Sequence, residues 1–389
     1  MSVTAAAGFV AAGGTCGLKD SGAPDLALVA TADGEPVATA AVFTANKLTA
    51  APVATSHAHL AATGGYASAV IVNSGNANAA TGAEGRADAE AMCEAVATRL
   101  ARPAEDVLVC STGLIGIPLP IGVVLAGVPD LLAGRGATSA HGAAAAEAMR
   151  TTDTHRKEAV AAAGTATVGG MAKGAAMLSP HMATMLAVCT TDAEASPEVL
   201  RRILKAAVDA SFNVLDVDGC TSTNDTVILM ASGAAGPVDV DVLQAAVTDV
   251  CTNLAGQMAG DAEGATKTVR VEVTGAASDA DAAAVARAIA RSQLVKCSWY
   301  GQDPYWGRIA SEAGSAGVGF DPATTSISYG GTVVSQGCVA VDHDTDAVAG
   351  HLAGRDLLVG VDLGLGGGTA HVLTNDLTHA YIDENMGTS

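Results

Sequence analysis

Short apolar runs alternate along this chain with longer segments in which apolar residues recur at helical spacing. Runs rich in β-branched and apolar residues between turn residues are typical of strands. They predict strands at 25–31, 37–44, 67–73, 107–111, 184–190, 225–231, 268–274 and 357–362. Helical periodicity predicts helices at 84–100, 140–148, 238–258 and 280–292, and a further helix that begins after Ser196. Because strands and helices alternate, we expect a layered α/β protein.

The helix after Ser196 has the clearest start signal in the chain. Ser196 is a good N-cap, Pro197 suits the first helical position, and Glu198 lies in the first turn. The apolar residues that follow recur on one face, which predicts that this face packs on a core. They are Val199, Leu200, Ile203, Leu204, Ala207 and Val208.

The regular helical pattern ends near Gln293, where a segment rich in Trp, Tyr and Gly begins. We therefore expect a main domain over 1–292 and a smaller C-terminal α/β domain over 293–389. Only 3% of the residues are aromatic, whereas 49% are hydrophobic and 45 are glycine. The core must therefore consist of closely packed Ala, Val, Leu and Ile, with glycine where two backbones approach each other.

The charge balance excludes one class of partner. The chain has 20 Lys and Arg residues against 40 Asp and Glu residues, a net charge of −20. A polyanion without a basic run repels phosphate backbones, so we expect no nucleic-acid binding. The apolar runs are interrupted well before the ~20 residues that a membrane helix needs, so we expect no membrane span. Residues 1–17 lack the basic and continuous apolar regions of a signal peptide.

The eight cysteines are scattered without a CxxC pair. This usage predicts reduced cysteines that act as small hydrophobes and a cytoplasmic location. It also argues against a zinc site, and the pair His57 and His59 lacks a third ligand in sequence. Four polar residues follow the helix that ends near Phe212, and we interpret them as helix-end and turn groups, with a place in an active-site wall as the alternative. They are Asp216, Asp218, Asn224 and Asp225.

A glycine-rich, irregular stretch leads into the apolar strand that Thr184 opens. Residues 169–186 read GGMAKGAAMLSPHMATML. Such a loop can bend the backbone so that the Thr184 hydroxyl attacks the carbonyl of Ala183, and water then hydrolyses the ester. The released Thr184 would combine a nucleophile with an α-amine that titrates near pH ~8. The alternative is that Thr184 is an ordinary β-branched strand residue.

This stretch resembles the cleavage signature of ornithine acetyltransferases, in which a GMAKG run precedes an A-T-M-L junction. Four other stretches resemble the same family in the same order, namely 73–79, 110–116, 151–153 and 303–308. The likeness extends from about Gly8 to the end of the chain. Two positions depart from it: Tyr305 stands where the family usually has Asn, and Ala80 where Cys is common.

The resemblance implies roles for individual residues. Thr112 and Gly113 match the oxyanion hole of the family, on a turn after the strand at 107–111, where hydroxyl and N–H donors can stabilise a tetrahedral oxyanion. The alternative for them is a plain strand-ending turn. The implied substrate ligands are Thr151, Lys173, Thr184, Glu263, Asn385 and Ser389, with Thr388 competing for the last position. Lys173 suits a substrate carboxylate. Glu263 suits the α-ammonium group of ornithine, or tunes the amine of the nucleophile.

The resemblance also implies a fold and a reaction. The fold is a four-layer α/β/β/α sandwich of the self-cleaving aminopeptidase and ornithine acetyltransferase type. Cleavage between Ala183 and Thr184 gives an α chain, 1–183, and a β chain, 184–389, which assemble as α2β2. In a ping-pong reaction Thr184 takes acetyl from N-acetyl-L-ornithine and passes it to L-glutamate for arginine biosynthesis, without a metal or a cofactor.

Three alternatives stay open at this point. The scaffold could serve an aminopeptidase or amidase that passes the acyl group to water, an acetyltransferase of a secondary pathway, or an uncleaved assembly protein without activity. The sequence also leaves open whether acetyl-CoA is a second donor for the acetylation of glutamate.

Overall fold

The computed structural model describes residues 2–179 and 185–386. The chain divides into two compact units. The first comprises Met1–Asn213 and Cys220–Met258, and the second comprises Val214–Gly219 and Ala259–Ser389. The sequence pattern suggested a boundary near Gln293. In the structure the division falls after Met258.

Two sheets pack face to face in the first unit. One has the strand order β1-β2-β5-β6 and the other the order β4-β3-β10-β9-β8-β7. The core between them joins Val29 and Leu108 of the first sheet to Met171 and Ile228 of the second. The strands are β1 (Phe9–Gly14), β2 (Leu26–Thr31), β3 (Val37–Phe43), β4 (Tyr66–Ala67), β5 (Ala69–Asn76), β6 (Val107–Leu114), β7 (Lys157–Ala163), β8 (Ala166–Lys173), β9 (Leu186–Glu194) and β10 (Thr226–Pro237).

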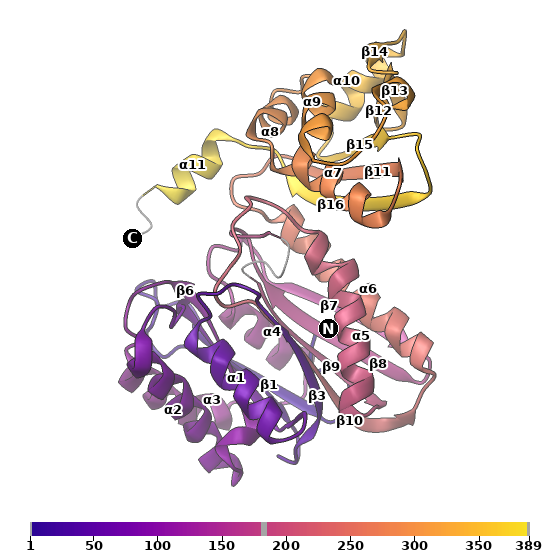
Figure 1. Cartoon of the computed structure of the whole chain (residues 1–389). Coiled ribbons are helices and arrows are strands. Elements are labelled where there is room, and N and C mark those ends of the chain that lie inside the picture. The colour runs from indigo at the N-terminus through magenta and orange to yellow at the C-terminus, as the bar shows by residue number, and fades with distance from the viewer. Residues whose placement is uncertain (1, 180–184, 387–389) are drawn as a thin grey trace. The chain divides into compact units, whose positions relative to one another are not determined.

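Helices cover the outer faces of both sheets (Figure 1). Met92 of α2 and Leu131 of α3 join Ile71 in a core on the outer side of the four-stranded sheet. α5 packs against β3, and α6 places Val250 against Gly170 of β8. The order helix, sheet, sheet, helix confirms the expected α/β/β/α sandwich. The helices of this unit are α1 (Ala51–Ala62), α2 (Gly82–Leu100), α3 (Ile121–Ala133), α4 (Ser139–Ala148), α5 (Pro197–Ala210) and α6 (Val240–Gly260), with the 3-10 turns Ala104–Asp106 and Phe212–Val214.

The helix predicted after Ser196 is α5. The Ser196 hydroxyl accepts a hydrogen bond from the N–H of Val199, and Pro197 occupies the first turn. The expected apolar face is buried at every position from Leu200 onward, whereas Val199 is only partly buried. This element is determined locally, because its cap and its stripe lie within one stretch of sequence.

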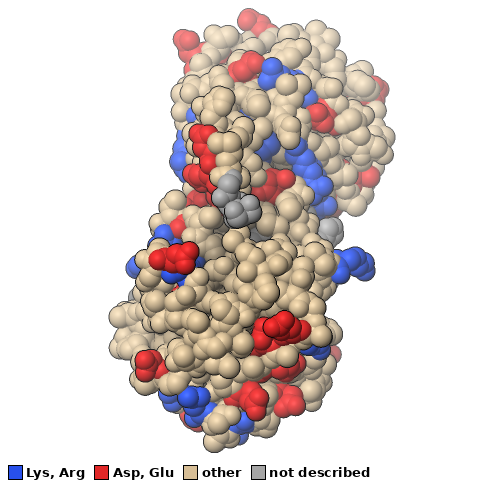
Figure 2. Space-filling view, turned by 90° about the vertical axis from the view of Figure 1, so that its left-hand side faces the viewer, with Lys and Arg blue, Asp and Glu red and all other residues tan. Residues whose placement is uncertain are grey.

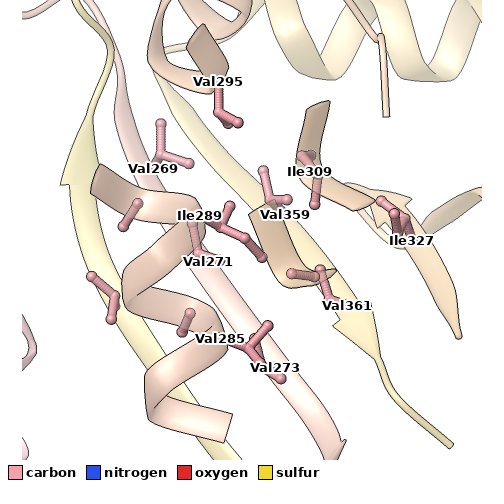
Figure 3. Close-up of a cluster of buried hydrophobic side chains, with 14 of the residues drawn as sticks. Val269, Val271, Val273, Val285, Ile289, Val295, Ile309, Ile327, Val359 and Val361 are labelled. Carbon is pink, nitrogen blue, oxygen red and sulfur yellow. The ribbon is translucent and has the colours of Figure 1, made fainter. Parts of the chain in front are cut away.

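The second unit has one sheet with the order β14-β13-β12-β15-β11-β16. Its core, shown in Figure 3, brings Val285 and Ile289 of α7 against Val271 of β11. This packing explains the position of the division, because α7 buries its apolar face in the second unit although it precedes Gln293. The elements are β11 (Thr268–Ala276), α7 (Asp279–Arg291), α8 (Gln293–Tyr300), α9 (Gly307–Ser315), the 3-10 turn Pro322–Thr324, β12 (Ser326–Tyr329), β13 (Thr332–Gln336), β14 (Val339–Ala340), α10 (Thr345–Ala353), β15 (Asp356–Asp362), β16 (Gly368–Asn375) and α11 (His379–Asn385).

The glycine-rich stretch that begins at Gly169 is more regular than we expected. Residues up to Lys173 belong to β8, which pairs antiparallel with β7 on one side and with β9 on the other. The glycines serve close packing: a Cβ on Gly169 would lie 2.3 Å from the carbonyl oxygen of Ser2, and one on Gly170 would lie 2.8 Å from Val250. Periodicity could not reveal this strand, because glycine adds no apolar side chain to the pattern.

Gly169→Ala should destabilise the protein by ~1–3 kcal/mol. The new methyl group would lie too close to the carbonyl oxygen of Ser2, and this backbone atom cannot move aside as a flexible side chain can. Urea unfolding of the two proteins measures the difference. Gly256→Ala in α6 is the matched control, since no atom lies within 4 Å of the added Cβ. Alanine also favours a helix over glycine. Equal stability of Gly169→Ala and the parent protein would contradict the close approach.

No helix in the described parts of the chain is long and apolar enough to cross a membrane. On the face in Figure 2, charged side chains stand in small scattered groups between uncharged residues. None of the eight cysteines forms a disulfide, and four of them are buried.

Candidate active site

Thr112 and Gly113 lie inside β6 and not on a turn beyond it, which corrects the sequence prediction. β6 continues to Leu114 because the parallel strand β5 also continues, through Ser74 and Gly75 to Asn76. Thr112 pairs with Ser74, and Gly113 pairs with Gly75. The stretch 73–79 thus supplies the partner strand for the predicted oxyanion hole.

Gly113 occupies a position that only glycine fits. Its φ of +138° is in a region that L-residues rarely adopt. A Cβ there would lie 2.3 Å from the carbonyl carbon of Gly75 and 2.4 Å from the nitrogen of Asn76. The residue before it is nearly enclosed, with Thr112 only 2% exposed. The two strand ends therefore approach each other closely at the residues that the resemblance assigns to the oxyanion hole.

The end of β6 is held by Asn224, which precedes β10. The amide nitrogen of Asn224 donates to the carbonyl oxygen of Ser111 at 2.9 Å and to that of Ala77 at 2.6 Å. Asn224 is buried. A distant residue therefore secures the segment that carries Thr112.

The next residue, Asp225, holds the start of β9. Its Oδ1 accepts a hydrogen bond from the N–H of Met185 at 2.9 Å, and the N–H of Thr226 donates to the carbonyl oxygen of Met185 at 3.2 Å. Burial raises the pKa of Asp225 well above its usual range, although Met185, Ser222 and Lys173 oppose the shift. The predicted cleavage bond, Ala183 to Thr184, lies outside the described residues, and β9 begins two positions after Thr184, at Leu186.

Thr151 and Lys173, two of the predicted substrate ligands, come together around Asp153. The carboxylate of Asp153 accepts hydrogen bonds from the N–H of Thr151 at 3.2 Å and from the N–H of Gly174 at 2.7 Å. It also forms an ion pair with Lys157 at 2.6 Å, in which both side chains are fully buried. Asp153 thus connects the stretch 151–153 to the end of β8, a role that the sequence did not suggest.

The ammonium group of Lys173 affects the pKa of two carboxyl groups, those of Asp153 and Asp225. Burial raises the pKa of Asp153, but the ammonium groups of Lys173 and Lys157 outweigh it and hold this pKa below its ordinary range. Lys173 also opposes the rise that burial causes in the pKa of Asp225. The ammonium group of Lys173 thus acts on both carboxyl groups, Asp153 and Asp225, within the first unit.

Lys157→Met should lower the free energy of unfolding by up to about 3–5 kcal/mol, because it breaks the buried ion pair with Asp153 and leaves Lys173 as the remaining ammonium group that acts on this carboxylate. The double variant Asp153→Asn/Lys157→Met is the control, since it removes both charges and should recover much of this loss. Urea unfolding at pH 7 compares the three proteins. A single variant as stable as the parent would show that the buried pair contributes nothing.

The same pair predicts how stability depends on pH. The pKa of Asp153 is lower in the folded protein than its value of about 3.9 in an unfolded chain. Its contribution is therefore complete above the unfolded pKa and is lost as the pH falls through the folded pKa. As the pH falls below about 4, the free energy of unfolding of the double variant should therefore decrease less than that of the parent protein, and acid unfolding measures this difference.

Glu263 and Asn385, two further predicted substrate ligands, are hydrogen-bonded to each other in the second unit. The amide nitrogen of Asn385 in α11 donates to Oε2 of Glu263 at 2.8 Å and to the carbonyl oxygen of Tyr381 at 2.8 Å. Glu263 lines a pocket of about 220 Å³ within this unit, together with other residues. Among these are Asp218, Arg291, Lys296, Asn375, Asp376 and Tyr381. Ser389 and Thr388 lie outside the described residues.

Lys296 is the most deeply buried cation of this pocket. Its ammonium group donates to the carbonyl oxygen of Val217 and to the hydroxyl of Thr374. Burial lowers the pKa of Lys296 to about 8, although Asp216 and other nearby carboxylates oppose the shift. The sequence did not single out this lysine, because nothing in its local pattern distinguishes it from a surface charge.

The four polar residues after Phe212 are divided between the two units. Asp216 and Asp218 belong to the second unit, where Asp216 accepts from the turn N–H of Gly219 and from Arg291. Asn224 and Asp225 belong to the first unit and bind Ser111 and Met185. The interpretation as turn groups fits Asp216, whereas Asn224 and Asp225 bind backbone that lies far away in the sequence, and their place in an active-site wall stays a prediction.

His59 binds the carbonyl oxygen of Val107 and the carboxylate of Glu90 through its two ring nitrogens. Among the described residues, no three His, Cys, Asp or Glu side chains gather as a metal-binding group.

Comparison with known proteins decides the family. The model of the ArgJ family matches residues 10–387. The chain belongs to the ArgJ family. It is 47% identical over 390 residues to the arginine biosynthesis bifunctional protein ArgJ of Thermobifida fusca, with all of both chains covered. It is 48% identical to the protein of that name from Mycolicibacterium paratuberculosis, covering 100% of this chain and 96% of the other.

Two solved structures are also similar to the chain. The ornithine acetyltransferase of Mycobacterium tuberculosis, complexed with ornithine, is 46% identical over 46% of this chain and 94% of its own, with a TM-score of 0.42. The ArgJ protein of Bacillus halodurans is 37% identical over 51% of this chain and 96% of its own, with a TM-score of 0.49. The family match and the full-length relatives confirm the resemblance at the level of the ArgJ family. The roles of individual residues stay predictions.

Proposed function

We propose that this acetyltransferase of arginine biosynthesis moves acetyl from N-acetyl-L-ornithine to L-glutamate through an ester on Thr184. Relatives that are 46–48% identical over 96–100% of their length are named arginine biosynthesis bifunctional protein ArgJ. One similar structure is described as an ornithine acetyltransferase complexed with ornithine. The observation that carries the proposal is the set of buried contacts through Asp153, Asn224 and Asp225, which joins the family-like stretches within the first unit.

Self-cleavage prepares the nucleophile. The hydroxyl oxygen of Thr184 attacks the carbonyl carbon of Ala183, the C–N bond between the two residues breaks, and the acyl group moves to oxygen. Water then hydrolyses the ester, which leaves a carboxylate on Ala183 and a free α-amine on Thr184. That amine has a pKa near ~8, so it can accept and return the hydroxyl proton during catalysis.

The transfer consists of two matched half-reactions. Thr184 attacks the acetyl carbonyl of N-acetylornithine, a tetrahedral oxyanion forms, and ornithine leaves with the proton that the α-amine returns. Glutamate then attacks the acetyl ester through its amino group, and N-acetylglutamate leaves as the Thr184 hydroxyl is restored. We assign Thr112 and Gly113 as donors to both oxyanions, since donors near a developing charge lower the barrier strongly.

We assign the substrate ligands as the family pattern suggests. Lys173 is the partner for a substrate carboxylate, and Thr151 lies beside it through their shared contacts with Asp153. Glu263, which holds the amide of Asn385, is the partner for an ammonium group. We keep Ser389 as a further ligand, with Thr388 as its competitor.

We also propose that the fragments 1–183 and 184–389 remain together and assemble as α2β2, and that the protein is cytoplasmic. The word bifunctional in the names of the relatives supports acetyl-CoA as a second donor to glutamate.

Three incubations test the proposal. The first mixes the protein with N-acetylornithine and glutamate, the second with acetyl-CoA and glutamate, and the third with N-acetylornithine alone. We expect N-acetylglutamate in the first and second, and at most slow release of ornithine in the third, with products identified by mass spectrometry. Rapid turnover in the third without transfer in the first would identify a hydrolase. No product in any incubation would favour the uncleaved assembly protein.

A further inference from the structure

We propose that Asn224 and Asp225 are positioning residues of the transferase site, each of which fixes one peptide group beside the reacting atoms. Asn224 fixes the peptide group between Ser111 and Thr112, and Asp225 fixes the backbone N–H of Met185, the residue that follows Thr184 in the sequence. This inference rests on the proposed function, because it takes Thr184 as the nucleophile and Thr112 as an oxyanion donor.

Asn224 acts on the proposed oxyanion hole through the backbone. Its amide nitrogen donates to the carbonyl oxygen of Ser111 at 2.9 Å. That carbonyl and the N–H of Thr112 belong to the same planar peptide group. A hydrogen bond to the oxygen of a peptide group holds its plane and polarises its N–H, as in any chain of hydrogen bonds. The second bond of the amide, to Ala77 at 2.6 Å, prevents the side chain from turning.

Asp225 acts in the same way at the start of β9. Its Oδ1 accepts the N–H of Met185 at 2.9 Å, and this nitrogen is bonded to the carbonyl carbon of Thr184. The N–H of Thr226 holds the other side of Met185 through its carbonyl oxygen. Two consecutive side chains thus fix peptide groups that lie 113 and 40 residues away along the chain. A shift of about 1 Å in a reacting group can slow catalysis about a hundredfold, so rigid placement here has a kinetic effect.

Asp225 can be tested by a conservative change, because its contact with Met185 uses one oxygen of the carboxyl group. Asp225 is 0% exposed, and burial raises its pKa well above its usual range although Met185, Ser222 and Lys173 oppose the shift. The amide of asparagine keeps an oxygen that can accept the N–H of Met185 and has nearly the same volume as the carboxyl group. Asn should therefore replace Asp225 with little loss.

The competing interpretation is that both residues only stabilise the fold. Asp192 in β9 provides a matched control for it. Like Asp225, Asp192 is a buried aspartate of the first unit that accepts backbone N–H groups, from Thr167 at 2.6 Å and from Ala7 at 3.0 Å. Asp192→Ala should lower the melting temperature and leave kcat unchanged.

The test compares Asp225→Ala, Asp225→Asn, Asn224→Ala and Asp192→Ala in the full chain. Steady-state kinetics with N-acetylornithine and glutamate, referred to the cleaved fraction found by mass spectrometry, are measured beside melting curves. We expect both Asp225→Ala and Asn224→Ala to lower kcat about a hundredfold while KM changes by about threefold or less. Asp225→Asn should stay within about tenfold of the parent kcat.

Normal kcat in Asp225→Ala and Asn224→Ala, with lowered melting temperatures, would overturn the inference. The proposed function would still stand if Thr184→Ala is inactive, so the two failures are distinguishable. If the alanine variants do not fold, Asn224→Asp and Asp225→Asn decide, because both keep the volume of the side chain. The inference requires Asn224→Asp, which loses both N–H donors, to lose kcat and Asp225→Asn to keep it; any other pattern contradicts it.

Discussion

Thr184→Ala should yield a single uncut chain of 38.1 kDa without transferase activity, whereas the parent protein should separate into fragments 1–183 and 184–389. The physical reason is that one hydroxyl serves both reactions: it attacks the carbonyl of Ala183 during cleavage and the acetyl group during transfer. Removing it abolishes the nucleophile, and without cleavage the α-amine that serves as the base never forms. Activity losses of this kind reach about a millionfold when a catalytic nucleophile is removed.

Intact-mass measurement and N-terminal sequencing check this result. Thr184→Ser is the conservative control, because it keeps the hydroxyl and loses only the methyl group, and it should retain part of both reactions. A β fragment that begins at any residue other than Thr184 would refute the mechanism. An uncut parent chain that still forms N-acetylglutamate would separate cleavage from transfer and leave Thr184 an ordinary strand residue.

Thr112→Ala should lower kcat about a hundredfold or more with little change in KM for N-acetylornithine. A lost oxyanion donor raises the barrier by ~3–4 kcal/mol, and a group that binds only the oxyanion contributes little to substrate binding. The position of Thr112 makes this a demanding test. It lies inside β6 and is 2% exposed, so its hydroxyl could instead be a buried structural group whose loss costs only ~1 kcal/mol of stability.

Ser56→Ala is the matched control for Thr112→Ala. The Ser56 hydroxyl is also buried and bonds the backbone of β6, donating to the carbonyl oxygen of Val109 at 2.7 Å and accepting its N–H at 2.8 Å. Its loss should lower the melting temperature without slowing turnover. Steady-state kinetics beside melting curves compare the two variants. If Thr112→Ala behaves like Ser56→Ala, the hydroxyl of Thr112 has no part in the mechanism.

Local sequence patterns determined the elements of this protein and much of its class. The helix after Ser196 could be predicted because its cap, its proline and its apolar face lie within one short stretch. The buried strands could be predicted because their runs are apolar in themselves. The family could be recognised because five short motifs survive in order, and a motif needs no knowledge of what it contacts.

Only the tertiary structure decided which distant groups meet. The division at Met258 depends on α7 burying Val285 and Ile289 in the core of the second unit, and no local pattern shows that choice. β8 is a strand because two neighbours pair with it, although its glycines carry no strand signal of their own.

The residues of the candidate site also fall into two groups, those that the sequence identified and those that only the tertiary structure revealed. The sequence alone identified Thr112, Gly113, Lys173 and Thr184, because these residues lie within recognisable motifs. It did not assign Asp153, Asn224 or Asp225 their roles, because each acts through hydrogen bonds to backbone that lies elsewhere in the chain. A backbone N–H or carbonyl is chemically the same at every residue, so only the fold determines which one a buried side chain holds.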